Sequence, residues 1–135
     1  MNTRFYNGRV LEDVCEAVRV KTGMDVFPDH RPSNAGADMQ CFAVVQIYNN
    51  QGDLGVQQQY RLLISIYART RSQGVAWVGK LQEMTDLVSE LFPIVASDNR
   101  YSIFSPRLLR NGYDGVCFTV WTLSSTLIVN TTDKF

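Results

Sequence analysis

The sequence has few of the residues on which catalysis and metal binding most often depend. Its 135 residues include one histidine and three cysteines. Cys15, Cys41 and Cys117 lie far apart, so they offer neither the close ligand pairs of a zinc site nor a disulfide framework. Isolated cysteines of odd number are typical of buried thiols in a reducing compartment. His30 lies in a polar segment, where no spacing argues for a cysteine beside it. The sequence therefore predicts no enzyme, no metal site and no cofactor.

An excess of charge and a long apolar run are also missing. The chain has 13 basic and 13 acidic residues, which argues against nucleic acid or an anionic membrane as its main partner. No window approaches the roughly 18 apolar residues that a membrane span needs, and the first residues lack the apolar core of a signal peptide. We expect a soluble protein that is made in the cytoplasm.

The sequence does contain clear helical periodicity. Residues 8–22 predict a first helix, which begins at Asn7-Gly8 and ends before Gly23. Residues 73–95 predict a second helix, with Pro93 as a kink or an ending in its last turn. Its apolar side chains recur at steps of three and four, which places them on one face: Trp77, Leu81, Met84, Val88, Leu91 and Val95.

Four segments have the alternation of strands. Residues 39–48 and 60–70 predict a hairpin joined by a turn at residues 49–55, and residues 101–109 and 116–129 predict two more strands joined at residues 111–115. Pro106 predicts an edge or a bulge in the third strand. In the second strand, alternate apolar residues are expected to face the core: Leu62, Ile64, Ile66 and Ala68.

Two segments are expected to lie outside regular structure. Residues 24–38 predict a long loop, which is either functional, ordered by a partner, or a plain surface connection. Residues 130–135 predict a frayed tail. The chain is thus expected to be one domain, residues 1–135, with the order α-β-β-α-β-β. The predicted fold class is an α+β two-layer sandwich, with two helices packed on one face of a mainly antiparallel sheet.

The order, lengths and apolar pattern of these elements resemble those of phage tail terminators, which end the tail tube of long-tailed bacteriophages. The resemblance covers nearly the whole chain. It includes the short first helix, the long loop, the strand that ends in Ile66-Tyr67-Ala68-Arg69 and the last strand, which ends in Leu127-Ile128-Val129. It implies a homo-oligomeric ring, usually of six subunits, in the tail-neck region of the virion. Such a ring binds the tail tube protein, stops its polymerisation and presents a surface to the head connector. No catalytic residue is carried over.

A ring subunit needs two different contact surfaces, because head-to-tail contacts close a cycle. Arginine and tyrosine are enriched in protein interfaces. The interface candidates lie on the outer face of the first hairpin, in its turn or near Pro106: Tyr48, Asp53, Arg61, Tyr67, Arg69, Arg71, Arg107 and Arg110. The long loop adds Asp29, His30 and Arg31 as further candidates.

Two alternative functions remain open. The chain could be another phage neck or head-tail joining protein of related fold. It could also be a non-viral α+β ligand-binding or regulatory domain that uses residues 24–38 as a ligand lid. The size of the native particle separates the two classes, since a ring supports a virion protein and a monomer or dimer supports a regulatory domain.

Overall fold

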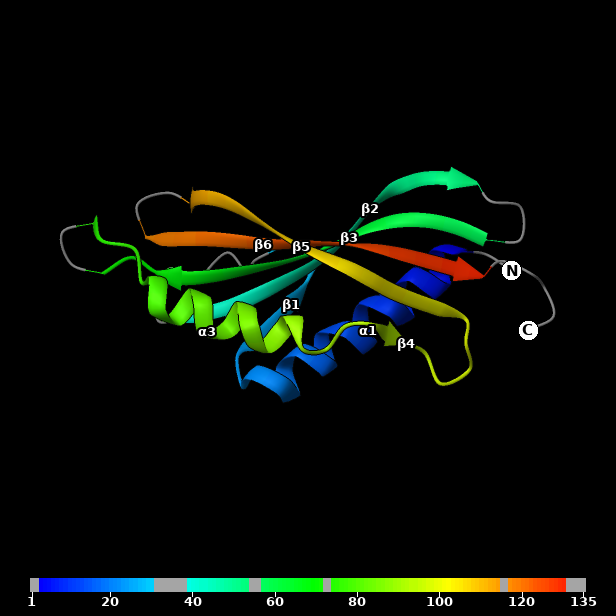
Figure 1. Cartoon of the computed structure of the whole chain (residues 1–135), viewed down its shortest axis with the longest axis horizontal. Coiled ribbons are helices and arrows are strands. Elements are labelled where there is room, and N and C mark those ends of the chain that lie inside the picture. Colours follow the sequence, from blue (N-terminus) through cyan, green and yellow to red (C-terminus); the bar gives the residue numbers. More distant parts are fainter. Residues whose placement is uncertain (1–2, 31–38, 54–56, 72–73, 115–116, 131–135) are drawn as a thin grey trace.

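The described part of the chain builds one six-stranded sheet and two helices (Figure 1). The computed structural model describes residues 3–30, 39–53, 57–71, 74–114 and 117–130. Its elements are α1 (Thr3–Thr22), β1 (Asp25–Pro28), β2 (Cys41–Asp53), β3 (Gln57–Arg69), α3 (Val78–Ser89), β4 (Ile94–Val95), β5 (Tyr101–Asp114) and β6 (Phe118–Asn130). Across the sheet the strands follow the order β1-β2-β3-β6-β5-β4. β1 pairs with β2 in parallel, whereas the other neighbouring strands pair antiparallel.

The predicted α-β-β-α-β-β sandwich on a mainly antiparallel sheet is wrong. The sheet is mixed and curled, and the structure is dominated by strands, with 51% strand against 28% helix. Two short strands make the difference. β1 forms inside the predicted loop by pairing with residues 42–45, and β4 forms at the end of the predicted second helix by pairing with Ser102 and Ile103. Such short strands depend on a distant partner, so local residue patterns carry little sign of them.

Several element boundaries also differ from the prediction. α1 begins before Asn7-Gly8, and α3 is much shorter than residues 73–95. Gly74 has a φ of 74°, which an α-helix does not accommodate. β2 and β5 continue into the predicted turns at residues 49–55 and 111–115. Register shifts between Tyr48 and Asn50 and between Arg110 and Gly112 let turn-forming residues stay within a bulged strand.

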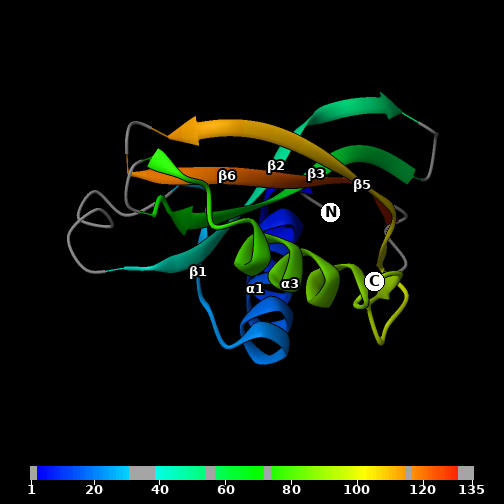
Figure 2. The ribbon, with the colours of Figure 1, turned by 60° about the vertical axis from the view of Figure 1, so that its left-hand side comes forward.

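The main core lies between the helices and one face of the sheet, which we call the inner face. Both helices lie on the same side of the sheet in two views (Figures 1 and 2). The predicted inward alternation of β3 is confirmed, because the four side chains expected to face the core, Leu62, Ile64, Ile66 and Ala68, are fully buried. The helices contribute residues that are also fully buried: Val10, Val14, Val18, Leu81 and Val88. Burial of such aliphatic side chains contributes about 1.5–3 kcal/mol each.

The opposite, outer face carries a second and smaller buried cluster. Phe42, Val44 and Phe118 are at most 2% exposed there, and Phe27 and Tyr67 pack beside them. The ends of β2, β3 and β5 curl away from the helices, so the outer face is concave (Figures 1 and 2). On a concave face, long side chains shield their shorter neighbours. This explains why three small polar residues are nearly buried there: Ser65, Thr122 and Ser124.

Candidate functional site

Two stretches of main chain lack a pairing strand among the described residues. β4 pairs only with Ser102 and Ile103 of β5, and β1 pairs only with residues 42–45 of β2. The later part of each strand, residues 104–114 of β5 and residues 46–53 of β2, therefore forms an open border. β2 and β5 lie on opposite sides of the central pair of β3 and β6. Accordingly, the end of β5 rises at the upper left and the end of β2 at the upper right (Figure 1).

The border of β5 has a regular centre and two irregular ends. Residues 107–110 pair in unbroken register with residues 121–124 of β6. On one side lie a register shift, Ser105 with a φ of 58°, and Pro106, which has no amide hydrogen. On the other side lies Gly112 with a φ of 100°. Bulges and proline protect sheet edges from indiscriminate pairing. Residues 107–110, which we call the β5 edge, form the longest stretch of unbroken register in this border.

Large apolar side chains are exposed on and beside the β5 edge. Leu108 is 37% exposed and lies opposite Leu123, whose side chain is in the main core. Leu109 is 43% exposed and lies opposite Thr122 on the outer face. Phe104 and Tyr113 are also exposed nearby. An open strand with apolar side chains on both faces presents the kind of surface that interfaces bury. The sequence analysis missed these four residues, although two adjacent leucines beside Pro106 were a usable sign.

The border of β2 begins with a second regular stretch. Residues 46–48, which we call the β2 edge, pair in regular register with β3 before the first bulge. Ile47 lies opposite Leu62 on the inner face. Tyr48 is 52% exposed on the outer face. Gln46 Nε2 donates a 2.7 Å hydrogen bond to the carbonyl oxygen of Asp29, which ties the edge to the end of β1.

Three predicted interface residues make contacts within the chain. Arg61 donates a hydrogen bond to a serine hydroxyl of β6. Tyr67 stacks on Phe42, with 4.6 Å between the ring centroids. The guanidinium of Arg69 lies 5.0 Å from the centroid of Phe118. These side chains cover the outer face and the second cluster, so they have a structural role whether or not a partner also contacts them.

The other predicted residues lie apart from one another. Tyr48 and Arg107 are exposed on the two edges. The guanidinium of Arg71 lies 4.2 Å from the ring centroid of Trp77. The remaining candidates are distributed as follows: Asp29 and His30 are exposed after β1, Asp53 and Arg110 lie in β2 and β5 with side chains outside the described residues, and Arg31 is itself outside them.

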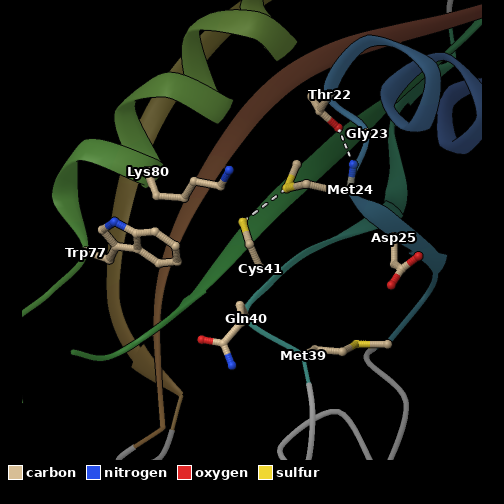
Figure 3. A pocket seen from close by; sticks show the side chains of 9 residues that line it. All are labelled: Thr22, Gly23, Met24, Asp25, Met39, Gln40, Cys41, Trp77 and Lys80. Carbon is tan, nitrogen blue, oxygen red and sulfur yellow. Dashed lines mark hydrogen bonds between the residues drawn. The ribbon is translucent and has the colours of Figure 1, made fainter. Parts of the chain in front are cut away.

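A pocket of about 570 Å³ lies where the end of α1, the start of α3 and the start of β2 meet (Figure 3). Trp77 and Lys80 line it from the α3 side and face Met24 and Cys41. The Cys41 thiol donates to the sulfur of Met24 at 3.3 Å. Burial raises the pKa of this thiol to about 11, and the nearby Lys80 lowers it only in part. Cys41 is therefore a protonated, unreactive thiol at neutral pH.

Alkylation of the native chain at pH 8 is expected to modify Cys117 well before Cys41 and Cys15. Cys117 is exposed, whereas burial raises the pKa of both other thiols. A pKa of about 11 leaves Cys41 with roughly 100-fold less thiolate than an ordinary cysteine. The pKa of Cys41 is higher in the folded state than in the unfolded state. The protonated Cys41 thiol therefore contributes stability below about pH 9, and this contribution is lost as pH rises towards 11. Peptide mass spectrometry measures the order of labelling, with the chain labelled in denaturant as the control. Equal alkylation rates for Cys41 and Cys117 in the native chain would contradict the predicted order of labelling.

The described residues contain no group of three or more histidine, cysteine, aspartate or glutamate side chains that could hold a metal ion. None of the described helices is long and apolar enough to cross a membrane. No protein-family model matches the chain, and no curated protein shows significant similarity to it. The two open edges are therefore the features on which a functional proposal rests.

Proposed function

We propose that this chain forms a head-to-tail ring that ends the tail tube of a long-tailed bacteriophage. The observation that carries the proposal is the pair of unlike edges, one on each side of the central strands. A heterologous contact needs two different surfaces on every subunit, and it gives a closed ring when the rotation between neighbours is right. The resemblance to tail terminators supplies the setting, a ring of six in the tail-neck region of the virion.

The curl of the sheet supports a ring over a straight filament. The β2 and β5 edges lie in parts of the sheet that curl away from the helices (Figures 1 and 2). Joining such subunits edge to edge adds a rotation at every step, which a flat sheet would not give. Contacts through the edges also leave the helical layer and the outer face free for other partners.

Native mass spectrometry of the purified chain tests the proposal. The expected result is one closed species of six times the 15.3 kDa chain mass, with or without divalent cation. Added to polymerising tube protein, this ring should stop elongation, which electron microscopy measures as shorter tubes of uniform length. Closed rings that leave tube length unchanged would assign the chain to another position in the neck.

A chain that stays monomeric alongside tube protein would overturn the proposal and favour a ligand-binding domain. Such a domain would use the pocket beside Trp77 and Cys41. Asp25 and Met39, two of its lining residues, belong to the chain segments before and after residues 31–38. The pocket is therefore the place to examine for bound ligand if no ring forms.

A further inference from the structure

We propose that neighbouring subunits join by strand pairing, with the β5 edge (residues 107–110) of one copy adding to the β2 edge (residues 46–48) of the next. This inference rests on the proposed ring and specifies its contact. The sheets of the subunits would then continue from one copy to the next. Main-chain hydrogen bonds would supply the attraction, as they do wherever an extended segment adds to an open sheet edge.

The faces of the two edges match in a continuous sheet. Tyr48 and Leu109 both lie on the outer face, because their partners Arg61 and Thr122 do. Ile47 lies on the inner face, opposite Leu62, and Leu108 lies there too, opposite Leu123. Because β2 and β5 run antiparallel within the sheet, the two edges also meet antiparallel when the inner faces are aligned. Ile47 can then lie directly opposite Leu108, which makes Tyr48 and Leu109 diagonal neighbours on the outer face. Aromatic-aliphatic and aliphatic pairs across strands are favourable contacts. The half-exposed apolar side chains of the β5 edge become covered.

The bulges set the length of the pairing. The β5 edge ends at register shifts on both sides, and the β2 edge ends at the shift between Tyr48 and Asn50. At its other end, the β2 edge meets β1, which occupies residues 42–45. Each edge therefore offers only three or four residues of regular strand. Because pairing is limited to the few regular residues between the bulges, it specifies one register. It also prevents the open-ended pairing that makes a long flat edge aggregate.

Charge favours unlike edges over two copies of the same edge. Residues 107–110 contain Arg107 and Arg110 and no acidic residue. Antiparallel pairing of two β5 edges would bring four arginines into one short contact, and such a concentration of like charge is destabilising. The β2 edge, residues 46–48, carries no charge. Pairing of unlike edges therefore avoids this repulsion, which gives the direction that a head-to-tail ring requires.

Hydrogen exchange tests the pairing directly. In the ring, the amides of residues 46–48 and 107–110 that point to the open side are expected to exchange at least about 100-fold more slowly than in monomers. The monomeric reference for each edge is the variant that is blocked at the opposite edge, because the measured edge then keeps its wild-type sequence. Leu109→Asp is therefore the reference for the β2 edge, and Tyr48→Asp is the reference for the β5 edge. Unchanged exchange at both edges of an intact ring would overturn the strand pairing and leave the proposed ring standing. Failure of the wild-type chain to form any ring would instead overturn the proposed function.

Proline substitutions in the β5 edge separate the contribution of main-chain hydrogen bonds to subunit association from the contribution of side chains. Adjacent residues of a strand direct their amides to opposite sides. One of Leu108→Pro and Leu109→Pro therefore removes an amide from the open side, and the other breaks the ladder with β6. The variant that stays folded is expected to associate roughly 100-fold more weakly than wild type.

Leu108→Thr and Leu109→Thr are the matched controls, because they keep every amide and a good strand residue. They are expected to weaken association by only about 10-fold. Sedimentation equilibrium measures both sets. A folded proline variant that assembles like its threonine counterpart would overturn the inference. If neither proline variant folds, the hydrogen-exchange result decides.

Discussion

Replacing Phe118 by alanine is expected to lower the free energy of unfolding by about 3–5 kcal/mol. Phe118 is 1% exposed, although it lies on the face of the sheet opposite the helices. Its ring makes an edge-to-face contact with Phe42 at 5.3 Å between centroids, and the guanidinium of Arg69 lies over it. Truncation would remove these contacts and leave a cavity that rigid neighbouring strands cannot fill. Urea denaturation followed by circular dichroism measures the change as a shift of the midpoint.

Phe104→Ala is the matched control for this prediction. It is the same chemical change on a strand of the same sheet, but Phe104 is 38% exposed, so a loss below about 1 kcal/mol is expected. Both variants should be compared in the Leu109→Asp background, because assembly would otherwise add to the apparent stability. If Phe118→Ala lowered the free energy of unfolding by as little as Phe104→Ala, the outer cluster would contribute little to the stability of the fold.

The elements that rest on their own periodicity could be predicted from the sequence. The helical stripe of Val10, Val14 and Val18 and the alternation of β3 are both buried in the main core. The fold class could not be predicted, because it depends on β1 and β4. A four-residue strand that contains a proline depends on pairing with β2 and on the burial of Val26 in the main core, and β2 follows it only after a gap in the described chain. A strand of two residues at the end of a helical pattern has no local signature at all.

The candidate site was predicted only in part, for a related reason. Tyr48 and Arg107 were identified from residue type and do lie on the open edges. Arg61 and Arg69 were identified by the same reasoning, yet they cover their own sheet. Leu108 was missed, because its exposure depends on how early β4 ends beside it. Pro106 does indicate an edge or a bulge in this strand, but which of the strand's residues stay uncovered depends on where the neighbouring β4 ends.

Two variants that each fail to assemble are expected to form a 1:1 dimer when they are mixed. Leu109→Asp blocks the β5 edge and Tyr48→Asp blocks the β2 edge, and both positions are half-exposed, so the fold should tolerate the change. Aspartate is short and a poor strand residue, so it places an unpaired charge in the contact. Each variant keeps one intact edge. In the mixture, one intact β5 edge meets one intact β2 edge, while the two blocked edges repel each other.

Native mass spectrometry should therefore show monomers for each variant alone and twice the chain mass for the mixture, with nothing larger. Val20→Asp is the control, since Val20 is 75% exposed on α1, away from both edges, and its variant should form rings like wild type. A contact between two identical edges would give another result. One variant would then dimerise by itself through its intact edge, and mixing would add nothing. Complementation thus requires a contact between unlike surfaces, which is also the condition for a ring that closes after a fixed number of subunits.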